Sequence, residues 1–554
     1  MGKQPTAQVR GYLVSIILFL TATFLSGTAN AASPGFRWVK TAGGTGSEVS
    51  YDLAVDSQGN CLTAGYFNST YFYWGNTLLL TNTVLTNAPM DCFVTLCNSN
   101  GVVQWARKLG GAGDDRAFCA AVDAQGCCYV AGRFDSPNLS VGNITLTNTA
   151  SNGRYSFFVA KLSPTGVPLW ARCPNKSFSS TAMGLAVDAS KNVYVTGSIN
   201  GTNIIGGTNF VVSSTTASDV LLLKYDPSGN LIWGQHPGGS NSDSGSDIAV
   251  DDAGSLYLSA AFRGTNVAFG SFVFSSPDRG FGELSDIVVA KYDPNGTVLW
   301  ANAFGGEYNE IARGIAVDAQ HNCYITGDYQ STNFALGGFV LTNSNPAGDL
   351  FVAKFSSNGV PLWAKSGHGD GFDSAWKIAV DPSGNSYIGG FFESPTLTID
   401  NVTVTNFVTN GFIDADGIIA KFDTDGNLLW TTQISADDEQ RVFSLGLSGD
   451  ALYATGWTQG TVYFGNESVT TSDIDLFVTR LYLDFPRLQY ALTNENGSNA
   501  LRLTWPVEAG LTFLQSSTNL HDWQWRGPGI FSANGEWTTT VSPTNSTFFR
   551  VQRF

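Results

Sequence analysis

The sequence predicts an all-β fold: a seven-bladed β-propeller closed by an N-terminal strand and followed by a small C-terminal β-sandwich. Two residue types recur in step along the chain, and the segments around them recur as short strands. The first is a tryptophan every 63–67 residues, at Trp38, Trp105, Trp170, Trp233, Trp300, Trp363 and Trp430. The second is an aspartate at Asp56, Asp123, Asp188, Asp251, Asp318 and Asp381, with Ser448 in the seventh place.

Each repeat contains four short apolar runs of the kind that form strands. In the fifth repeat they include residues 314–318 (GIAVD), 322–327 (NCYITG) and 349–354 (DLFVAK), followed by a Trp run. These runs are rich in Val, Ile, Tyr and Phe and are bounded by Gly, Asn, Asp and Pro, which favour tight turns. Four antiparallel strands repeated several times are typical of a β-propeller, whereas sustained helical periodicity is absent from the repeats.

The order of the runs predicts how the ring closes. The first Trp run precedes the first complete repeat, and the last repeat, which ends at residues 475–480, has no Trp run after it. We therefore expect residues 36–44 to supply the missing fourth strand of the last blade. This pairing would remove an open sheet edge that otherwise invites aggregation.

The repeats are longer than the roughly 40–50 residues of familiar propeller blades. The surplus lies between the second and third runs, for example in residues 66–90, 133–156, 262–285 and 391–415. These segments are rich in Asn, Thr, Ser and Gly, and each is interpreted as an additional small hairpin on its blade.

The two ends of the chain differ from the repeats. Residues 1–31 contain Lys3, Arg10, an apolar run over 13–25 and an Ala-x-Ala sequence ending at Ala31, which is typical of a cleaved signal peptide. The apolar run is shorter than the roughly 20 residues of a membrane span. We expect a secreted or cell-surface protein, with the periplasm as the alternative, and no transmembrane segment after cleavage. The propeller is assigned to residues 36–485 and the β-sandwich to residues 486–554.

The repeat "AVDxxGNxYVTG … DxFVAKYDxxGxxLWA" resembles the seven-bladed β-propeller repeat family of secreted and surface bacterial proteins, and it covers every predicted blade. The resemblance implies the fold and an exported location, but no catalytic residues. Residues 486–554 resemble the small immunoglobulin-like or fibronectin-like domains of exported bacterial proteins.

The recurring polar and aromatic positions have a structural explanation beside each functional one. The aspartates could hold Ca²⁺, but they stand where hairpin turns favour Asp, so no cofactor is expected. The tryptophans could stack on sugars, but their place in an apolar strand favours packing between blades. The lysines and the arginine that recur in the third run are expected to be strand residues with solvated heads: Lys161, Lys224, Lys291, Lys354, Lys421 and Arg480.

Eight cysteines in an exported protein could form disulfides. However, Cys61, Cys128 and Cys323 occupy equivalent slots of separate blades, which are too far apart to be bridged. Cys92 and Cys97 should point to opposite faces of one strand. Buried free thiols are therefore expected, and no Cys or His cluster has the spacing of a zinc site.

The composition favours binding over catalysis. A net charge of −16 excludes the usual electrostatic attraction to nucleic acid, and no hydrolase, phosphate-binding or dinucleotide motif is present. The first additional hairpin has the densest aromatic residues, so Tyr71, Tyr73 and Trp74 are the candidate ligand contacts for a glycan or an envelope protein. The alternative is that these aromatics only cover the neighbouring blade.

The second function considered is a propeller enzyme with an active site in the channel, either a polysaccharide lyase or hydrolase, or a quinoprotein-like oxidoreductase. Quinoprotein dehydrogenases resemble this chain in their blade-wise Trp positions, and some have a vicinal disulfide comparable to Cys127 and Cys128. That resemblance implies eight blades and a Ca²⁺–quinone ligand set, and this sequence matches neither.

Overall fold

A computed structural model describes residues 34–483 apart from 83–88, 151–153, 213, 215, 277–283, 408–413 and 466, together with strands between residues 489 and 553. The expected signal peptide, residues 1–31, lies outside the described residues. One compact unit spans Gly35–Leu481, and the strands between residues 489 and 553 belong to another. All secondary-structure elements of the described residues are strands. The described part of the chain accordingly contains no helix long and apolar enough to span a membrane.

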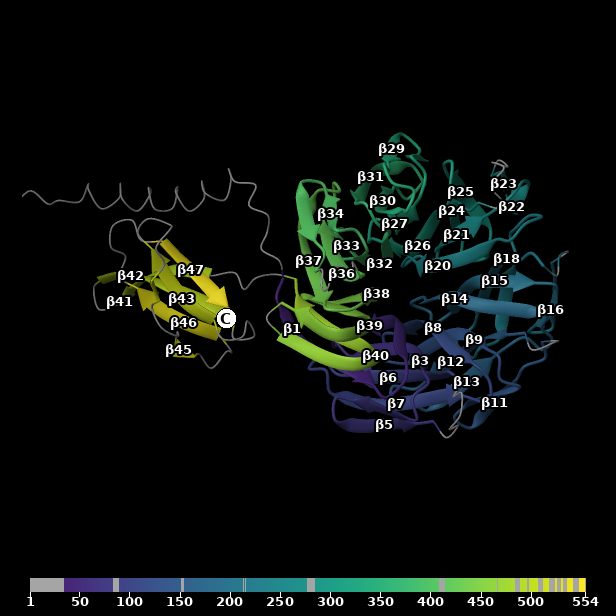
Figure 1. Cartoon of the computed structure of the whole chain (residues 1–554), viewed down its shortest axis with the longest axis horizontal. Helices are drawn as coiled ribbons and strands as arrows, with labels where there is room; N and C mark the ends of the chain where they lie inside the picture. Colours follow the sequence, from purple (N-terminus) through teal and green to yellow (C-terminus); the bar gives the residue numbers. More distant parts are fainter. Residues whose placement is uncertain are drawn as a thin grey trace, which may run out of the picture. The chain divides into compact units, whose positions relative to one another are not determined.

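The larger unit consists of seven blades, each of four antiparallel strands paired in succession, and hairpin strands join some of the blades into larger sheets (Figure 1). The innermost strands are β2 (Glu48–Val55), β8 (Asp115–Val122), β14 (Ser179–Val187), β20 (Ser244–Val250), β26 (Glu310–Val317), β32 (Asp373–Val380) and β38 (Gln440–Ser448). The second strands are β3 (Cys61–Phe67), β9 (Cys128–Phe134), β15 (Val193–Asn200), β21 (Leu256–Phe262), β27 (Cys323–Tyr329), β33 (Ser386–Phe392) and β39 (Ala451–Phe464).

The third and fourth strands complete the blades. The third are β6 (Asp91–Cys97), β12 (Ser156–Leu162), β18 (Asp219–Tyr225), β24 (Asp286–Tyr292), β30 (Asp349–Phe355), β36 (Asp416–Phe422) and β40 (Glu467–Tyr482). The outermost are β7 (Val103–Gly110), β13 (Pro168–Arg172), β19 (Leu231–Gln235), β25 (Val298–Phe304), β31 (Pro361–His368), β37 (Leu428–Ala436) and, in the last blade, β1 (Phe36–Gly43).

The ring is closed by the beginning of the chain, as predicted. Strand β1 pairs antiparallel with β40, and Val39 lies opposite Thr479. In addition, each innermost strand contacts the innermost strands of the blades before and after it, and β38 contacts β2. The seven blades therefore form one circle whose last blade contains strands from both ends of the unit.

The predicted additional hairpins are present. They are formed by β4 (Tyr71–Trp74) with β5 (Thr77–Thr81), β10 (Asn138–Val141) with β11 (Ile144–Thr147), β16 (Thr202–Ile205) with β17 (Thr208–Val211), β22 (Val267–Phe269) with β23 (Phe272–Phe274), β28 (Asn333–Leu336) with β29 (Phe339–Thr342), and β34 (Thr396–Ile399) with β35 (Val402–Thr405). Strands β4, β10 and β34 pair with the outermost strand of the preceding blade. In the last blade the long strand β39 does the same by pairing with β37. The hairpins thus add a second sheet connection between neighbouring blades.

The recurring tryptophans connect each blade to the next. The indole N–H of Trp105 donates to the Pro164 carbonyl of the following blade at 2.8 Å. The corresponding bonds of Trp38, Trp170, Trp233, Trp300 and Trp363 measure 3.0–3.1 Å. Glycine is required in the accepting turn, because a Cβ on Gly166 would lie 2.7 Å from the Trp105 ring and its φ is +75°. Inter-blade packing accounts for these positions; Trp430 occupies the same strand position and is buried.

The recurring aspartates hold hairpin turns, and the repeated lysines pack beside them. Asp318 Oδ1 accepts the backbone N–H groups of Gln320 and Asn322, while its Oδ2 accepts the Tyr324 hydroxyl at 3.0 Å. The Lys354 ammonium lies 5.0 Å from the Tyr324 ring centre and 4.0 Å from Asp318. The expectation of solvated heads is wrong, because these lysines and Arg480 are at most 9% exposed. The charges of Lys161, Lys291 and Lys354 are instead stabilised by a carboxylate and an aromatic face. Lys224, Lys421 and Arg480 also lie over an aromatic ring.

The C-terminal strands form two antiparallel sheets. One has the order β41 (Gln489–Glu495), β42 (Ser498–Pro506), β46 (Glu536–Val541) and β45 (Ile530–Phe531). The other has the order β44 (Gln524–Trp525), β43 (Thr512–Ser517) and β47 (Phe548–Arg553).

Candidate functional site

The first additional hairpin separates its aromatic side chains onto two faces. Along β4, Phe72 and Trp74 are buried, whereas Tyr71 and Tyr73 are 52% and 37% exposed. This alternation follows from the two-residue period of a strand. Phe72 and Trp74 join the hydrophobic cluster that also holds Trp38 of the closing strand. The buried face of the hairpin therefore covers the neighbouring strands, and only the exposed face is available to contact a ligand.

Trp74 is a packing residue in this arrangement. Its side chain is 7% exposed, and its indole N–H donates to the Gly101 carbonyl at 3.3 Å. Gly101 lies in the turn that packs against Trp38. Trp74 therefore has neither a free ring face nor a free donor for a ligand. The expectation that it contacts a ligand is not supported by its burial, and only Tyr71 and Tyr73 remain as candidates.

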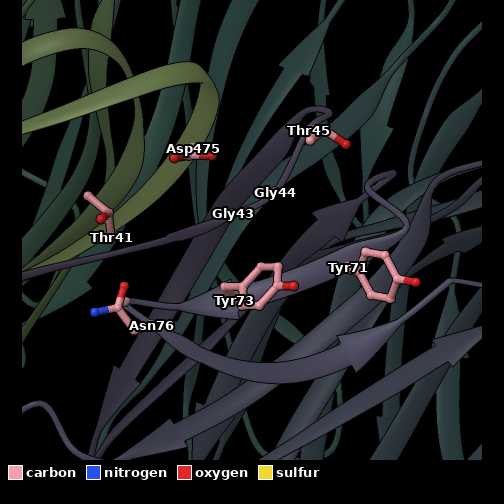
Figure 2. Close-up of a pocket in the computed structure, with 9 residues that line it drawn as sticks. Thr41, Gly43, Gly44, Thr45, Tyr71, Tyr73, Asn76 and Asp475 are labelled. Carbon is pink, nitrogen blue, oxygen red and sulfur yellow. The ribbon is translucent and has the colours of Figure 1, made fainter.

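The two tyrosines line a cavity of about 480 Å³ at the seam where the ring closes. Its other lining residues come from the end of β1 and the following loop, from the turn of the first hairpin and from β40: Thr41, Gly43, Gly44, Thr45, Gly75, Asn76 and Asp475. Figure 2 shows the two tyrosine rings following one another along β4, with Asn76 beyond Tyr73 and Asp475 on β40, on the far side of β1. The volume is in the range of small-molecule sites.

A carboxyl group with a raised pKa forms part of this cavity. Burial and the nearby Glu48 carboxyl raise the pKa of Asp475 to about 7. A Cβ on Gly43 would lie 1.7 Å from Asp475 Oδ1, so glycine is required for this approach. Asp475 Oδ1 has no hydrogen-bond partner among the described residues. Near neutral pH this group can therefore both accept and donate hydrogen bonds.

The pair of exposed tyrosines is specific to the first hairpin. A single exposed tyrosine, Tyr463 on β39, occupies the place of Tyr73 in the last blade. Strand β10 has the same burial pattern as β4, but its outward residues are Asn138 and Ser140. The outward residues of the other short hairpin strands are mostly small or polar: Thr202, Ile204, Ala268, Asn333, Ala335, Thr396 and Thr398. The fold of the hairpin thus does not require an aromatic residue at either position.

The central channel holds a second cluster of charged and aromatic side chains. Every innermost strand has a β-bulge at the same place. At these bulges, the Tyr51 ring lies 5.1 Å from Phe118 and 5.6 Å from Phe443, and Trp376 lies 4.4 Å from Phe443. The residue after each bulge forms the next layer along the channel.

Lys377 dominates this next layer. Its ammonium lies 3.1 Å from Asp247 of the fourth blade and 3.6 Å from Asp52 of the first, each two blades away from its own. Burial opposes protonation, but the two carboxylates outweigh it and raise the pKa of Lys377. Ser444 and the Ala120 N–H also donate to Asp52. These contacts connect separate blades, so the cluster has a structural role in holding the innermost strands together.

The remaining candidates contribute no further site. Among the described residues, no three His, Cys, Asp or Glu side chains are grouped as a metal site would require. All eight cysteines are free thiols, including Cys127 and Cys128. Cys92 and Cys97 join different hydrophobic clusters, as expected for opposite faces of β6.

Comparisons with known proteins agree with a propeller built from repeats. No protein-family model matches the chain. An uncharacterised WD repeat-containing protein of Acanthamoeba polyphaga mimivirus is 24% identical over 537 residues, which cover 81% of this chain and 38% of that protein. The regulatory protein FlaEY of Caulobacter vibrioides is 24% identical over 334 residues, which cover 56% of this chain and 34% of that protein. The chain thus spans little more than a third of the length of these relatives.

Solved structures with a similar arrangement of strands share little sequence with this chain. The WD40 domain of Neurospora crassa Pan2 has a TM-score of 0.39 and 10% identity, covering 78% of this chain and 89% of that one. The polysaccharide lyase Uly1 has a TM-score of 0.41 and 10% identity, covering 83% of this chain and 94% of that one. Scores this low say nothing about function. Together with the strand order, the sequence similarities describe a WD40-like β-propeller.

Proposed function

We propose that the protein is an exported binding or scaffolding propeller that recognises a glycan through the Tyr71–Tyr73 cavity and performs no chemistry. The observation that carries this proposal is the pair of exposed tyrosines on one face of β4 at the mouth of a 480 Å³ cavity. Export is supported by the predicted signal peptide. The C-terminal sheets are proposed to pack as a small β-sandwich that serves as an attachment domain or spacer.

The chemistry of the cavity fits a sugar. An aromatic face packs against the C–H groups of a pyranose ring, while hydroxyl, amide and carboxyl groups bond its hydroxyls. The ring centres of Tyr71 and Tyr73 are 6.4 Å apart, and Asn76, Asp475 and Thr41 supply polar groups around them. A flat protein partner would need a buried area of more than about 1,000 Å². A concave site of this size is better matched to one or two sugar units.

Replacing both tyrosines by alanine is expected to weaken glycan binding strongly without unfolding the protein. Each ring contributes about 1 kcal/mol of stacking, so Tyr71→Ala with Tyr73→Ala should weaken binding by about thirtyfold. Both side chains are partly exposed, so the melting temperature should change little. The measurement is an array of neutral-hexose and uronate oligosaccharides, followed by titration calorimetry with the strongest binder.

The matched control is Tyr463→Ala on β39. Tyr463 is 39% exposed and does not line the cavity, so its removal should leave binding unchanged. An unchanged array profile for the double variant at an unchanged melting temperature would refute the proposed glycan site.

A further inference from the structure

Two cysteines stand directly opposite each other in the first blade. Cys61 is the first residue of β3 and Cys97 is the last residue of β6, and they are cross-strand partners. Their side chains are 0% and 1% exposed. A hydrogen bond between the two thiols, together with burial, raises the pKa of Cys61 well above its usual range. The two sulfur atoms therefore face each other inside the blade.

This pairing occurs in the first blade and not at the matching positions of the next five. There the partners are Cys128 with Leu162, Val193 with Tyr225, Leu256 with Tyr292, Cys323 with Phe355 and Ser386 with Phe422. The slot requires only a side chain that packs, and a second cysteine is not needed to fill it. Packing within the blade thus does not explain why both residues of this cross-strand pair are cysteines.

We propose that Cys61 and Cys97 form a disulfide when the protein folds in the presence of a disulfide oxidant such as oxidised glutathione. Residues directly opposite each other in an antiparallel pair have Cα atoms about 4.5–5.5 Å apart, within the roughly 4.4–6.8 Å that a disulfide spans. The Cys61 thiolate attacks one sulfur of oxidised glutathione, forming a mixed disulfide and releasing one glutathione thiolate. The Cys97 thiolate then attacks the Cys61 sulfur and releases the second. Two protein thiols are oxidised, and their protons pass to the two glutathione molecules.

Burial determines when the reaction takes place. A thiol that is nearly inaccessible and reluctant to ionise reacts slowly. The two thiols are therefore oxidised while the chain is folding, before the neighbouring blade covers them. The same burial protects the finished bond from reductants.

The bond would enclose the segment that carries the tyrosine hairpin. Residues 62–96 contain β4 and β5, and the cysteines pack in the cluster that includes Trp38 of the closing strand and Tyr453. A disulfide here would stabilise the first blade at the seam, because it restricts the unfolded chain between the two cysteines. This inference does not depend on the proposed glycan, since it concerns a covalent bond that can be counted in the absence of any ligand.

Counting thiols in denaturant tests the proposal. Protein refolded with oxidised glutathione, then denatured and treated with a thiol reagent, is expected to show six thiols, against eight after refolding with a reductant. Cys61→Val, with the residue that the third blade has in this slot, should show seven thiols under both conditions. Cys128→Val is the matched control and should fall from seven to five.

Peptide mapping under non-reducing conditions should identify the Cys61–Cys97 bond. Eight thiols in the oxidised wild type, or a loss of two thiols that persists in Cys61→Val, would overturn the proposal. A disulfide between Cys127 and Cys128 would also overturn it if the Cys61 and Cys97 thiols remained free.

Discussion

Deleting residues 36–43 is expected to prevent the propeller from reaching a cooperatively folded state. The deletion removes β1, which is the outermost strand of the last blade, and exposes the edges of both β40 and β4. It also removes Trp38, which is 9% exposed and whose loss alone would cost about 3–5 kcal/mol. Domains are stabilised by only about 5–15 kcal/mol, so the total loss should approach the whole stability. Scanning calorimetry should show no main transition, or aggregation below the wild-type melting temperature.

Removal of residues 486–554 is the control for this deletion. Those residues lie in the other compact unit, so the main transition should remain within a few degrees of its wild-type temperature. A shortened chain lacking 36–43 that melts like the wild type would show that β1 does not hold the ring together.

The second large effect is a loss of stability as the pH rises from about 4 to about 7. At five junctions between blades, an acid on a third strand lies near an acid in or beside the innermost strand of the next blade. The pairs are Asp475 with Glu48, Asp91 with Asp115, Asp219 with Asp243, Asp286 with Glu310, and Asp349 with Asp373. Burial, together with the second acid of each pair, raises the pKa of Asp475, Asp115, Asp243, Glu310 and Asp373 to about 7.

The direction of the effect follows from proton binding. In the unfolded chain these groups ionise near pH 4, so between about pH 4 and 7 the folded protein holds more protons than the unfolded one. The free energy of unfolding therefore falls as the pH rises through this interval. We expect the melting temperature to be highest near pH 4 and to decline by at least about 5 °C by pH 8.

Asp349→Asn tests this origin at one junction. Asp349 and Asp373 are 1% and 0% exposed, burial raises the pKa of Asp349 to about 7, and its Oδ2 has no hydrogen-bond partner among the described residues. The neutral amide cannot ionise, so the decline in melting temperature from pH 5 to 8 should be smaller in the variant. Asp226→Asn, in an exposed turn where hydrogen bonds from Asn230 lower the pKa of Asp226, is the control and should not reduce the decline. A wild-type stability that rises from pH 5 to 8 would contradict the proposed protonation of the pairs.

The ring could be predicted from the repeats because the role of each recurring tryptophan and turn aspartate is indicated by residues close to it in the sequence. The turn of Asp318 and the strand that follows it depend on residues within a few positions. The burial of Lys354 was not predictable in this way, because the Tyr324 ring and the Thr424 carbonyl that surround it come from another strand and another blade.

The candidate site was predictable only in part. The density of aromatic residues identified Tyr71 and Tyr73, and the two-residue period of a strand separates them from Trp74 once the register is known. Asp475 could not be connected with them from the sequence, because it joins the cavity only through the closure of the ring. Likewise, the sequence does not show that Cys61 and Cys97 lie opposite each other, because this depends on the register of β3 and β6, which are separated by a long insertion.

The most direct measurement of ring closure is a crosslink between the two ends of the larger unit. Val39 and Thr479 are cross-strand partners, so Val39→Cys with Thr479→Cys should form a disulfide within one chain under mild oxidation, detected by peptide mapping of the monomer. Val39→Cys with Thr95→Cys, which has the same strand position in the first blade, is the control and should not react. Equal crosslinking of both pairs, or crosslinks found only between two chains, would contradict closure of the ring by the protein's own first strand.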